Sequence, residues 1–262
     1  NGDLVQPVKD HIFAVTRRAL PLTGLTDRSR PLRQDPELRT ALLLVGLVPL
    51  VLLAHHWLFA LTVPDVGFLS GVAATLWGAV FTAGSFLTTT GYESAHWGQA
   101  RVWSGLQAPG MMLLGLAIFG GGVATTAGGV KLLRVYALFR HGERELERIV
   151  HPSSIGGKGA AARRLRREGA YMAWVFFMLF AMSIAGVTLL LSMCGLEFQS
   201  ALVLSIAALT TTGPLADVAL VDPIAYGPLS GMVKLVLGAA MIVGRLETLA
   251  LIALIAPGGW RR

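Results

Sequence analysis

A four-residue motif, Thr-Thr-Thr-Gly, occurs twice in this chain, at residues 88–91 (the first tetrad) and 210–213 (the second tetrad). Each copy follows a short apolar run and lies between two longer apolar runs. At membrane depth, such a hydroxyl- and glycine-rich break is tolerated only where the backbone lines a water-filled path or is buried in protein. Two breaks 122 residues apart therefore predict a duplicated pore-forming unit.

The composition places both breaks in a membrane protein. Hydrophobic residues make up 54% of the 262 residues and charged residues only 14%, whereas soluble domains carry roughly 25% charged residues. Several apolar runs reach or approach the roughly 20 residues that span a bilayer core. We therefore predict an all-α polytopic membrane protein. The single cysteine, Cys194, excludes an intramolecular disulfide and a cysteine-rich metal site.

Charged residues are separated by sign along the chain. Most Lys and Arg residues lie in two segments, 9–39 and 131–167. The hydrophilic patches around the tetrads instead hold the acids Asp65, Glu93, Glu197, Asp217 and Asp222. The positive-inside rule then puts the basic segments in the cytoplasm and the acidic ones outside. This alternation around apolar runs argues against nucleic acid as a partner, despite the net charge of +7.

The first tetrad belongs to a unit that we expect to cover residues 36–150, preceded by a cytoplasmic connection over 1–35. Asp35 and Pro36 predict the start of its first helix, as N-cap and first helical residue. In order, the unit contains a long run at 38–59, a loop at 60–70, a short run at 71–87, the tetrad, a run at 102–119, a glycine-dense break at 119–130 (the glycine loop) and a basic helix at 131–149. The short run suits a re-entrant segment that stops at the tetrad.

The second tetrad lies in a unit of the same plan, which we expect at 170–262 after a cytoplasmic linker at 151–169. This unit contains a long run at 171–193, a short run at 198–209, the tetrad, a loop at 217–228 and a long run at 229–256. Each unit is thus predicted to consist of an outer helix, a short pore helix, a filter strand and an inner helix. Both ends of each unit then fall on the same side, in agreement with the charge pattern.

The tetrads have the chemistry of a cation filter. A dehydrated cation needs several oxygen ligands, which backbone carbonyls can supply. Glycine permits the required backbone angles, threonine adds hydroxyl oxygens, and a helix that ends at the tetrad directs a partially negative C-terminus at the ion. Small residues also pack helices closely, but two copies in matching positions favour a filter. The expected filter residues are Thr88, Thr89, Thr90, Gly91, Thr210, Thr211, Thr212 and Gly213.

Other candidate sites carry weaker signals. Arg245 and Glu247 are ionisable residues in an apolar run and must face the protein interior or water. The glycine loop is no phosphate-binding loop, because Leu132 follows Lys131 where that motif needs a hydroxyl. His55 and His56 diverge on a helix and lack a third ligand, so we expect them at the outer interface rather than at a metal.

Three stretches resemble the Trk/Ktr/HKT potassium transporters, and the TrkH type best. They are TTTGY at 88–92, GGGVATTAGGVKLLR at 120–134 and GRLETLALIAL at 244–254. Members of this family have four pore-loop units in one chain, folded around one pore. The resemblance covers nearly the whole chain and matches the third and fourth units. It implies that this chain is the C-terminal half, with two further units outside it.

The resemblance also implies roles for individual residues. Potassium would bind to filter carbonyls, and the glycine loop would interrupt the third inner helix below the filter and act as a gate. Arg245 would form a positive barrier in the pore. The expected gate residues are Gly120, Gly121, Gly122, Thr125, Thr126, Gly128, Gly129 and Arg245. Two stretches depart from the family pattern: 124–129 reads ATTAGG where GSTAGG is usual, and Pro214 and Leu215 follow the second tetrad where Gly-Pro-Gly is usual.

The family further implies a homodimer in the bacterial inner membrane, surrounded by lipid, with a cytosolic nucleotide-binding regulatory subunit like TrkA or KtrA. Neither enzymatic activity nor a cofactor is expected. A secondary cation transporter, coupled to sodium or protons, is the alternative, because its broken helices also bind ions at mid-membrane. That alternative predicts a carboxylate close to the break. Glu93 and Asp217 lie near the tetrads but on the outer side, which favours a pore.

Overall fold

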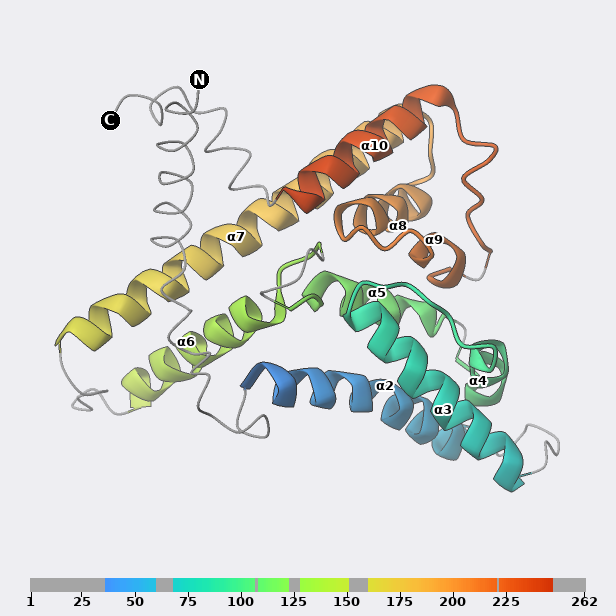
Figure 1. Ribbon diagram of the computed structural model, residues 1–262, viewed down its shortest axis with the longest axis horizontal. Coiled ribbons are helices and arrows are strands. Elements are labelled where there is room, and N and C mark those ends of the chain that lie inside the picture. The colour runs from blue at the N-terminus through green and yellow to red at the C-terminus, as the bar shows by residue number, and fades with distance from the viewer. Residues whose placement is uncertain are drawn as a thin grey trace, which may run out of the picture.

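The computed structural model describes residues 36–59, 68–106, 108–122, 128–150, 160–220 and 222–246. Within these ranges the regular structure consists of helices, with no strand, which agrees with the predicted all-α class. Helices of the first unit lie together on one side of Figure 1, and α8, α9 and α10 of the second unit lie together on another. The predicted filter residues are all described, whereas Thr125, Thr126 and Glu247 lie outside the described residues.

The first unit begins with α2 (Pro36–Phe59), which starts at the predicted proline. Helix α3 (Phe68–Leu87) ends immediately before the first tetrad, as expected. Its 20 residues make it longer than the run predicted at 71–87. The helix that precedes the tetrad is therefore longer than a minimal pore helix.

The run at 102–119, expected as one inner helix, is divided into α4 (Trp97–Ser104) and α5 (Gly110–Phe119). Gly105 adopts a left-handed φ of 68° and its N–H donates to the Val102 carbonyl, which ends α4. Pro109 then precedes α5, and a proline disfavours helical geometry in the residue before it. Helix α6 (Leu132–Val150) follows the glycine loop close to the predicted bounds.

The second unit consists of α7 (Ala160–Met193), α8 (Phe198–Leu209), α9 (Leu215–Val218) and α10 (Gly231–Arg245). Helix α8 matches the predicted short run in full. The linker expected at 151–169 is helical from Ala160 onward, because this stretch is rich in Ala, Arg and Leu, which favour helices. Helix α10 is described up to Arg245; the rest of the expected run to residue 256 lies outside the described residues.

Among the described residues, two helices are long and apolar enough to cross a membrane: Glu37–Leu58 within α2 and Gly169–Met193 within α7. Their outward faces carry large apolar side chains, such as Leu43 and Met182, which are more than 70% exposed in the isolated chain. Such contiguous apolar surface is typical of helices that face lipid or a further protein surface.

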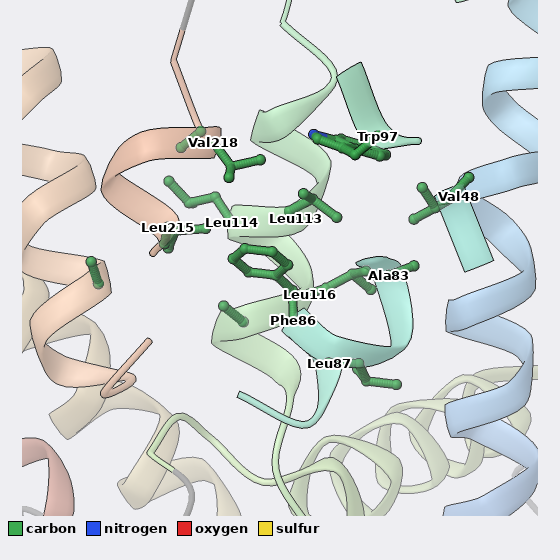
Figure 2. Packing of buried hydrophobic residues seen from close by; sticks show 14 of the residues in the cluster. Val48, Ala83, Phe86, Leu87, Trp97, Leu113, Leu114, Leu116, Leu215 and Val218 are labelled. Carbon is green, nitrogen blue, oxygen red and sulfur yellow. The ribbon is translucent and has the colours of Figure 1, made fainter. Parts of the chain in front are cut away.

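The core lies where the two units meet. Figure 2 shows Phe86 of α3, three leucines of α5 and, from the second unit, Leu215 and Val218 of α9 in one apolar cluster. A second cluster surrounds α8, whose side chains are buried from Val203 to Leu209 by α7 and α10. Both short helices that precede the tetrads thus end inside packed protein, which fixes the position of each tetrad.

Candidate ion pathway

The three threonines of each tetrad have the same backbone geometry, whereas the glycines differ, because only Gly91 has a positive φ. The second threonine of each has a left-handed φ, 55° at Thr89 and 57° at Thr211. The three threonine N–H groups also donate to matching carbonyls of the preceding helix. The bonds are Thr88 to Gly84 (3.0 Å), Thr89 to Phe86 (3.1 Å) and Thr90 to Ser85 (2.9 Å), against Thr210 to Ile206 (2.8 Å), Thr211 to Ala208 (3.1 Å) and Thr212 to Ala207 (2.9 Å). Each donor and each acceptor in the second copy lies 122 residues after its counterpart in the first copy, which is the spacing of the sequence repeat.

The shared geometry is strained. A left-handed φ is unusual for a β-branched residue, and such strain persists where the surrounding structure over-determines it, commonly at functional sites. The first threonine of each tetrad is also fixed by its side chain, because Thr88 Oγ1 donates to the Gly84 carbonyl at 3.0 Å and Thr210 Oγ1 to the Ile206 carbonyl at 2.8 Å. Each hydroxyl hydrogen therefore points back to its helix, and the Thr88 oxygen also lies 2.8 Å from the Thr90 hydroxyl.

The tetrads lie against each other. A Cβ atom added to Gly91 would lie 3.0 Å from Pro214 Cδ and 3.3 Å from Thr212 Cγ2. Gly91 also has a φ of 83°, in the region that favours glycine. Gly213 differs, because a Cβ atom there meets nothing within 4 Å. The glycine of the first tetrad is thus needed for close approach to the second.

The exposure of the threonines differs between the copies. Thr88 and Thr90 are exposed, whereas their counterparts Thr210 and Thr212 are fully buried. The first unit covers the second tetrad, and the corresponding flank of the first tetrad is open. When similar units are arranged head to tail around an axis, each unit covers the same surface of the next one. A surface that is covered in one unit and exposed in the other is expected where a neighbouring unit of the ring lies outside this chain.

The two described ends of the glycine loop lie against the last residues of the helices that precede the tetrads. The N–H of Gly121 donates to the carbonyl of Leu87, the last residue of α3, at 2.9 Å. A Cβ atom added to Gly128 would lie 2.6 Å from the carbonyl oxygen of Leu209, the last residue of α8, and 2.7 Å from that of Thr210. Leu87 and Leu209 are counterparts in the repeat, so the loop contacts the same point below each tetrad.

The ends of the glycine loop are joined to each other. The Val130 N–H donates to the Ile118 carbonyl at 2.9 Å, and the Leu132 N–H to the Gly121 carbonyl at 3.1 Å. These two backbone bonds form a closed neck between α5 and α6. Gly129 reaches this position with a φ of 88° and lies close to the carbonyls of Ala117 and Ile118. The residues on either side of the loop are therefore held together by their own backbone.

The last turn of α10 reaches the same level. A Cβ atom added to Gly244 would overlap the Leu209 carbonyl oxygen and lie 2.7 Å from its carbon. Arg245 is the next residue, at the end of α10, and is exposed. The structure thus brings the predicted arginine and the glycine loop to the lower end of α8, directly below the second tetrad.

Two cations near the loop were not singled out by the sequence. Lys131 lies between the two donors of the neck, Val130 and Leu132, with a left-handed φ of 63°, and both Lys131 and Arg134 are largely buried. The Arg134 guanidinium stacks over the Phe176 ring of α7 at 3.7 Å from its centre, a favourable cation–π distance. The contact with α7 distinguishes Arg134 from the exposed charged residues further along α6.

The outer side of the tetrads holds two carboxylates. Burial raises the pKa of the Glu93 carboxyl, an effect that nearby Arg101 opposes and Asp217 reinforces. Glu93 follows the first tetrad and Asp217 lies on α9 after the second, so the interaction joins both units. The carboxylates lie at the predicted outer end of the pathway.

Two further contacts fix the segments on this side. The Ser94 N–H donates to the buried Thr82 hydroxyl at 3.2 Å, and the Tyr226 hydroxyl donates to the Gly213 carbonyl at 2.8 Å. Burial, aided by Asp217, raises the pKa of Tyr226 to about 12, so its hydroxyl stays protonated. Sequence reasoning missed Tyr226, because nothing in a tyrosine within a loop indicates its partner.

The histidine pair has a structural role. His55 Nδ1 lies 2.6 Å from the Ser104 carbonyl and His56 Nδ1 lies 2.7 Å from the Trp103 carbonyl. The His56 ring stacks on Trp103 at 3.8 Å. Both imidazoles thus bind the C-terminal end of α4, and among the described residues no group of acids, histidines and cysteines could hold a metal ion.

Comparisons with known proteins agree with this arrangement. A family model described as "TrkH: Cation transport protein" matches residues 8–259. The chain is 31% identical over 235 residues to the Trk system potassium uptake protein TrkH of Salmonella typhimurium, covering 87% of this chain and 44% of that protein. It is 32% identical over 233 residues to the protein of the same name from Vibrio parahaemolyticus, with the same coverage.

A solved structure is similar as well. The crystal structure of the potassium transporter TrkH from Vibrio parahaemolyticus superposes with a TM-score of 0.66 and 27% identity, over 87% of this chain and 46% of that one. The chain therefore spans about half the length of the relatives that it matches.

The matching family is one of cation transport proteins and not of enzymes. The chain belongs to the TrkH family. Its fold is that of two tandem units of the four-unit cation channel fold, and it is a multi-pass protein of the bacterial inner membrane.

Proposed function

We propose that this chain supplies two neighbouring quarters of a potassium uptake pore. The observation that carries the proposal is the matching geometry of the threonines in the two tetrads, including the strained φ at Thr89 and Thr211 and the matching backbone hydrogen bonds. Their direct contact through Gly91 supports one shared pathway rather than two separate ones. Relatives named as potassium uptake proteins support potassium as the transported ion.

In this pore the tetrads bind the ion. Backbone carbonyls at 88–91 and 210–213 replace part of the water around a potassium ion, and α3 and α8 direct their partially negative ends toward it. The uncovered flank at Thr88 and Thr90 is the place where a further unit of the ring packs. The complete filter then contains strands beyond the two in this chain.

The gate lies below the filter. The glycine loop contacts the lower ends of both α3 and α8, so its movement opens or blocks the pathway beneath both strands at once. Arg245 adds a positive charge at the same level, which repels a cation leaving the filter. Gly120, Gly121, Gly122, Gly128 and Gly129 serve this gate, together with Thr125 and Thr126 of the same loop.

The protein works as a homodimer with a cytosolic nucleotide-binding regulatory subunit. Helix α6 and the first half of α7 project on the side of the molecule away from α4 and α9 (Figure 1). Helix α6 exposes Phe139, Leu146 and Ile149 among its charges. This mixed surface, on the basic side of the protein, suits a protein partner in the cytoplasm.

A secondary transporter requires an ionisable group at the ion site to couple two ions. The carboxylates closest to the tetrads among the described residues are Glu93 and Asp217, beyond the outer end. A pore that lets potassium follow its electrochemical gradient is therefore favoured. Uptake that stops when the sodium or proton gradient is removed at constant membrane potential would support the transporter instead.

The filter assignment is tested in cells that lack their own potassium uptake systems and express the native gene. A Cβ atom meets nothing within 4 Å at either Gly213 or Gly115 of α5, so serine fits sterically at both. We expect Gly213→Ser to lose most potassium uptake or selectivity at normal membrane abundance, and Gly115→Ser to retain both. Unchanged rate and selectivity in Gly213→Ser would overturn the assignment.

A further inference from the structure

The loop that follows α9 returns to the outer end of the second tetrad. Residues 222–230 form an outer strap that is hydrogen-bonded to three neighbouring segments. The Ile224 N–H donates to the Ala216 carbonyl at 3.1 Å, the Tyr226 hydroxyl to the Gly213 carbonyl at 2.8 Å, and the Lys234 ammonium to the Gly227 carbonyl at 2.8 Å. The strap is thereby tied to α9, to the tetrad and to α10.

Tyr226 is fixed at both ends of its side chain. Its ring packs against the apolar cluster around α8, and its hydroxyl reaches the last carbonyl of the tetrad. A carbonyl oxygen has two lone pairs, so the phenol occupies one and leaves the other for an ion. The Gly213 carbonyl is therefore held in one orientation by a donor outside the filter strand.

We propose that Tyr226 is a positioning residue that sets cation selectivity by pinning the outermost carbonyl of the second tetrad. The inference rests on the proposed filter. A sodium ion is smaller than a potassium ion, so carbonyls must move inward to bind it closely. A carbonyl pinned from outside resists this movement, because it would have to leave the phenol. Discrimination against sodium thus depends on the strap as well as on the filter strand itself.

At the first tetrad, no described side chain donates a hydrogen bond to the glycine carbonyl in this way. Tyr92 follows Gly91 directly, but its side chain is 69% exposed and its phenol makes no hydrogen bond to the described residues. Gly91 is instead fixed by its close contact with Thr212 and Pro214. Gly213 lacks comparable contacts, so the hydrogen bond from Tyr226 has the larger effect on carbonyl orientation. Tyr92 is therefore a matched control for Tyr226.

The experiment measures competition by sodium against potassium uptake, with the native gene expressed in cells that lack other potassium uptake systems. Tyr226→Phe keeps the ring and removes only the hydroxyl. We expect its potassium-over-sodium preference to fall about fivefold, which corresponds to one hydrogen bond of about 1 kcal/mol. Membrane abundance and the maximal rate at saturating potassium should stay close to those of the wild type. Tyr92→Phe should leave the preference unchanged.

The outcomes separate the two proposals. If Gly213→Ser impairs uptake but Tyr226→Phe keeps the wild-type preference, the strap has no role in selectivity and the pore remains. If Tyr226→Phe and Tyr92→Phe lower the preference equally, the specific role of Tyr226 is refuted. A wild-type protein that does not prefer potassium also overturns the inference. Absence of potassium uptake by the wild type would refute the proposed pore itself.

Discussion

Substitution of Gly244 tests how closely α10 must approach the second pore helix. An added Cβ atom would overlap the Leu209 carbonyl oxygen and lie 2.7 Å and 2.8 Å from its carbon and Cα. Backbone atoms of a buried helix end cannot move aside as a flexible side chain can. Overpacking of this kind destabilises by about 1–3 kcal/mol. We therefore expect Gly244→Ala to separate the end of α10 from α8.

The matched control lies on the same helix. A Cβ atom added to Gly238 meets nothing within 4 Å, and alanine is favoured over glycine in a helix by about 1 kcal/mol. Gly238→Ala should therefore be at least as stable as the wild type. The two variants have the same change in composition and opposite expected signs, so their difference reports the contact with Leu209 alone.

The assay is the midpoint of thermal denaturation of the purified native protein in detergent, followed by size-exclusion chromatography. One kcal/mol corresponds to about 2–4 °C for chains of this size, so Gly244→Ala should lose several degrees. Its potassium uptake should also change, because Leu209 precedes Thr210 of the tetrad and Arg245 follows Gly244. Equal stability and equal uptake of the two variants would refute the close packing of α10 on α8.

Two other predictions concern charge along the pathway. Arg245→Ala should raise cation flux severalfold, because it removes a positive barrier. The flux is measured in vesicles that contain the wild type or the variant of the native protein. A lower flux at normal stability would indicate a structural role for Arg245 instead. Because burial raises the pKa of Glu93, its carboxyl stays protonated to a higher pH than an ordinary carboxyl. Uptake at low potassium concentration should therefore rise as the external pH increases through that range, because the deprotonated carboxylate attracts cations to the outer end of the pathway. Glu93→Gln should remove this part of the pH profile of uptake. An unaltered profile would contradict a role for Glu93.

Local sequence patterns were sufficient for the elements that precede the tetrads. Helix α8 has its predicted bounds because a polar turn precedes its uniform apolar run and the tetrad ends it. The repeat also predicts that the tetrads are equivalent, since the same residues favour the same backbone. The division between α4 and α5 was missed, because Gly105 and Pro109 stand within an apolar run whose periodicity suggests one helix.

Contacts between distant residues could not be predicted from one sequence. The carbonyl partners of His55 and His56 are 49 and 47 residues away, and the partner of Tyr226 lies in the preceding tetrad. Each of these side chains has many possible partners in the unfolded chain. Their pairing depends on how α2 packs on α4 and how the strap returns over α9, which local propensity does not determine. The start of α7 was missed for a different reason, because charged residues form helices as readily as linkers.

The neck of the glycine loop has a consequence for how this protein can diverge. Its two closing bonds join main-chain groups at residues 118, 121, 130 and 132. Any residue with a backbone N–H at 130 and 132 can supply the donors, so the neck does not depend on side-chain identity. The neck therefore makes no demand on the side chains at 124–127, where the chain reads ATTA, whereas Gly128 is constrained by its close contacts and Gly129 by its positive φ. In the pore that we propose, variation within the loop can adjust the gate while the neck keeps α5 and α6 in register.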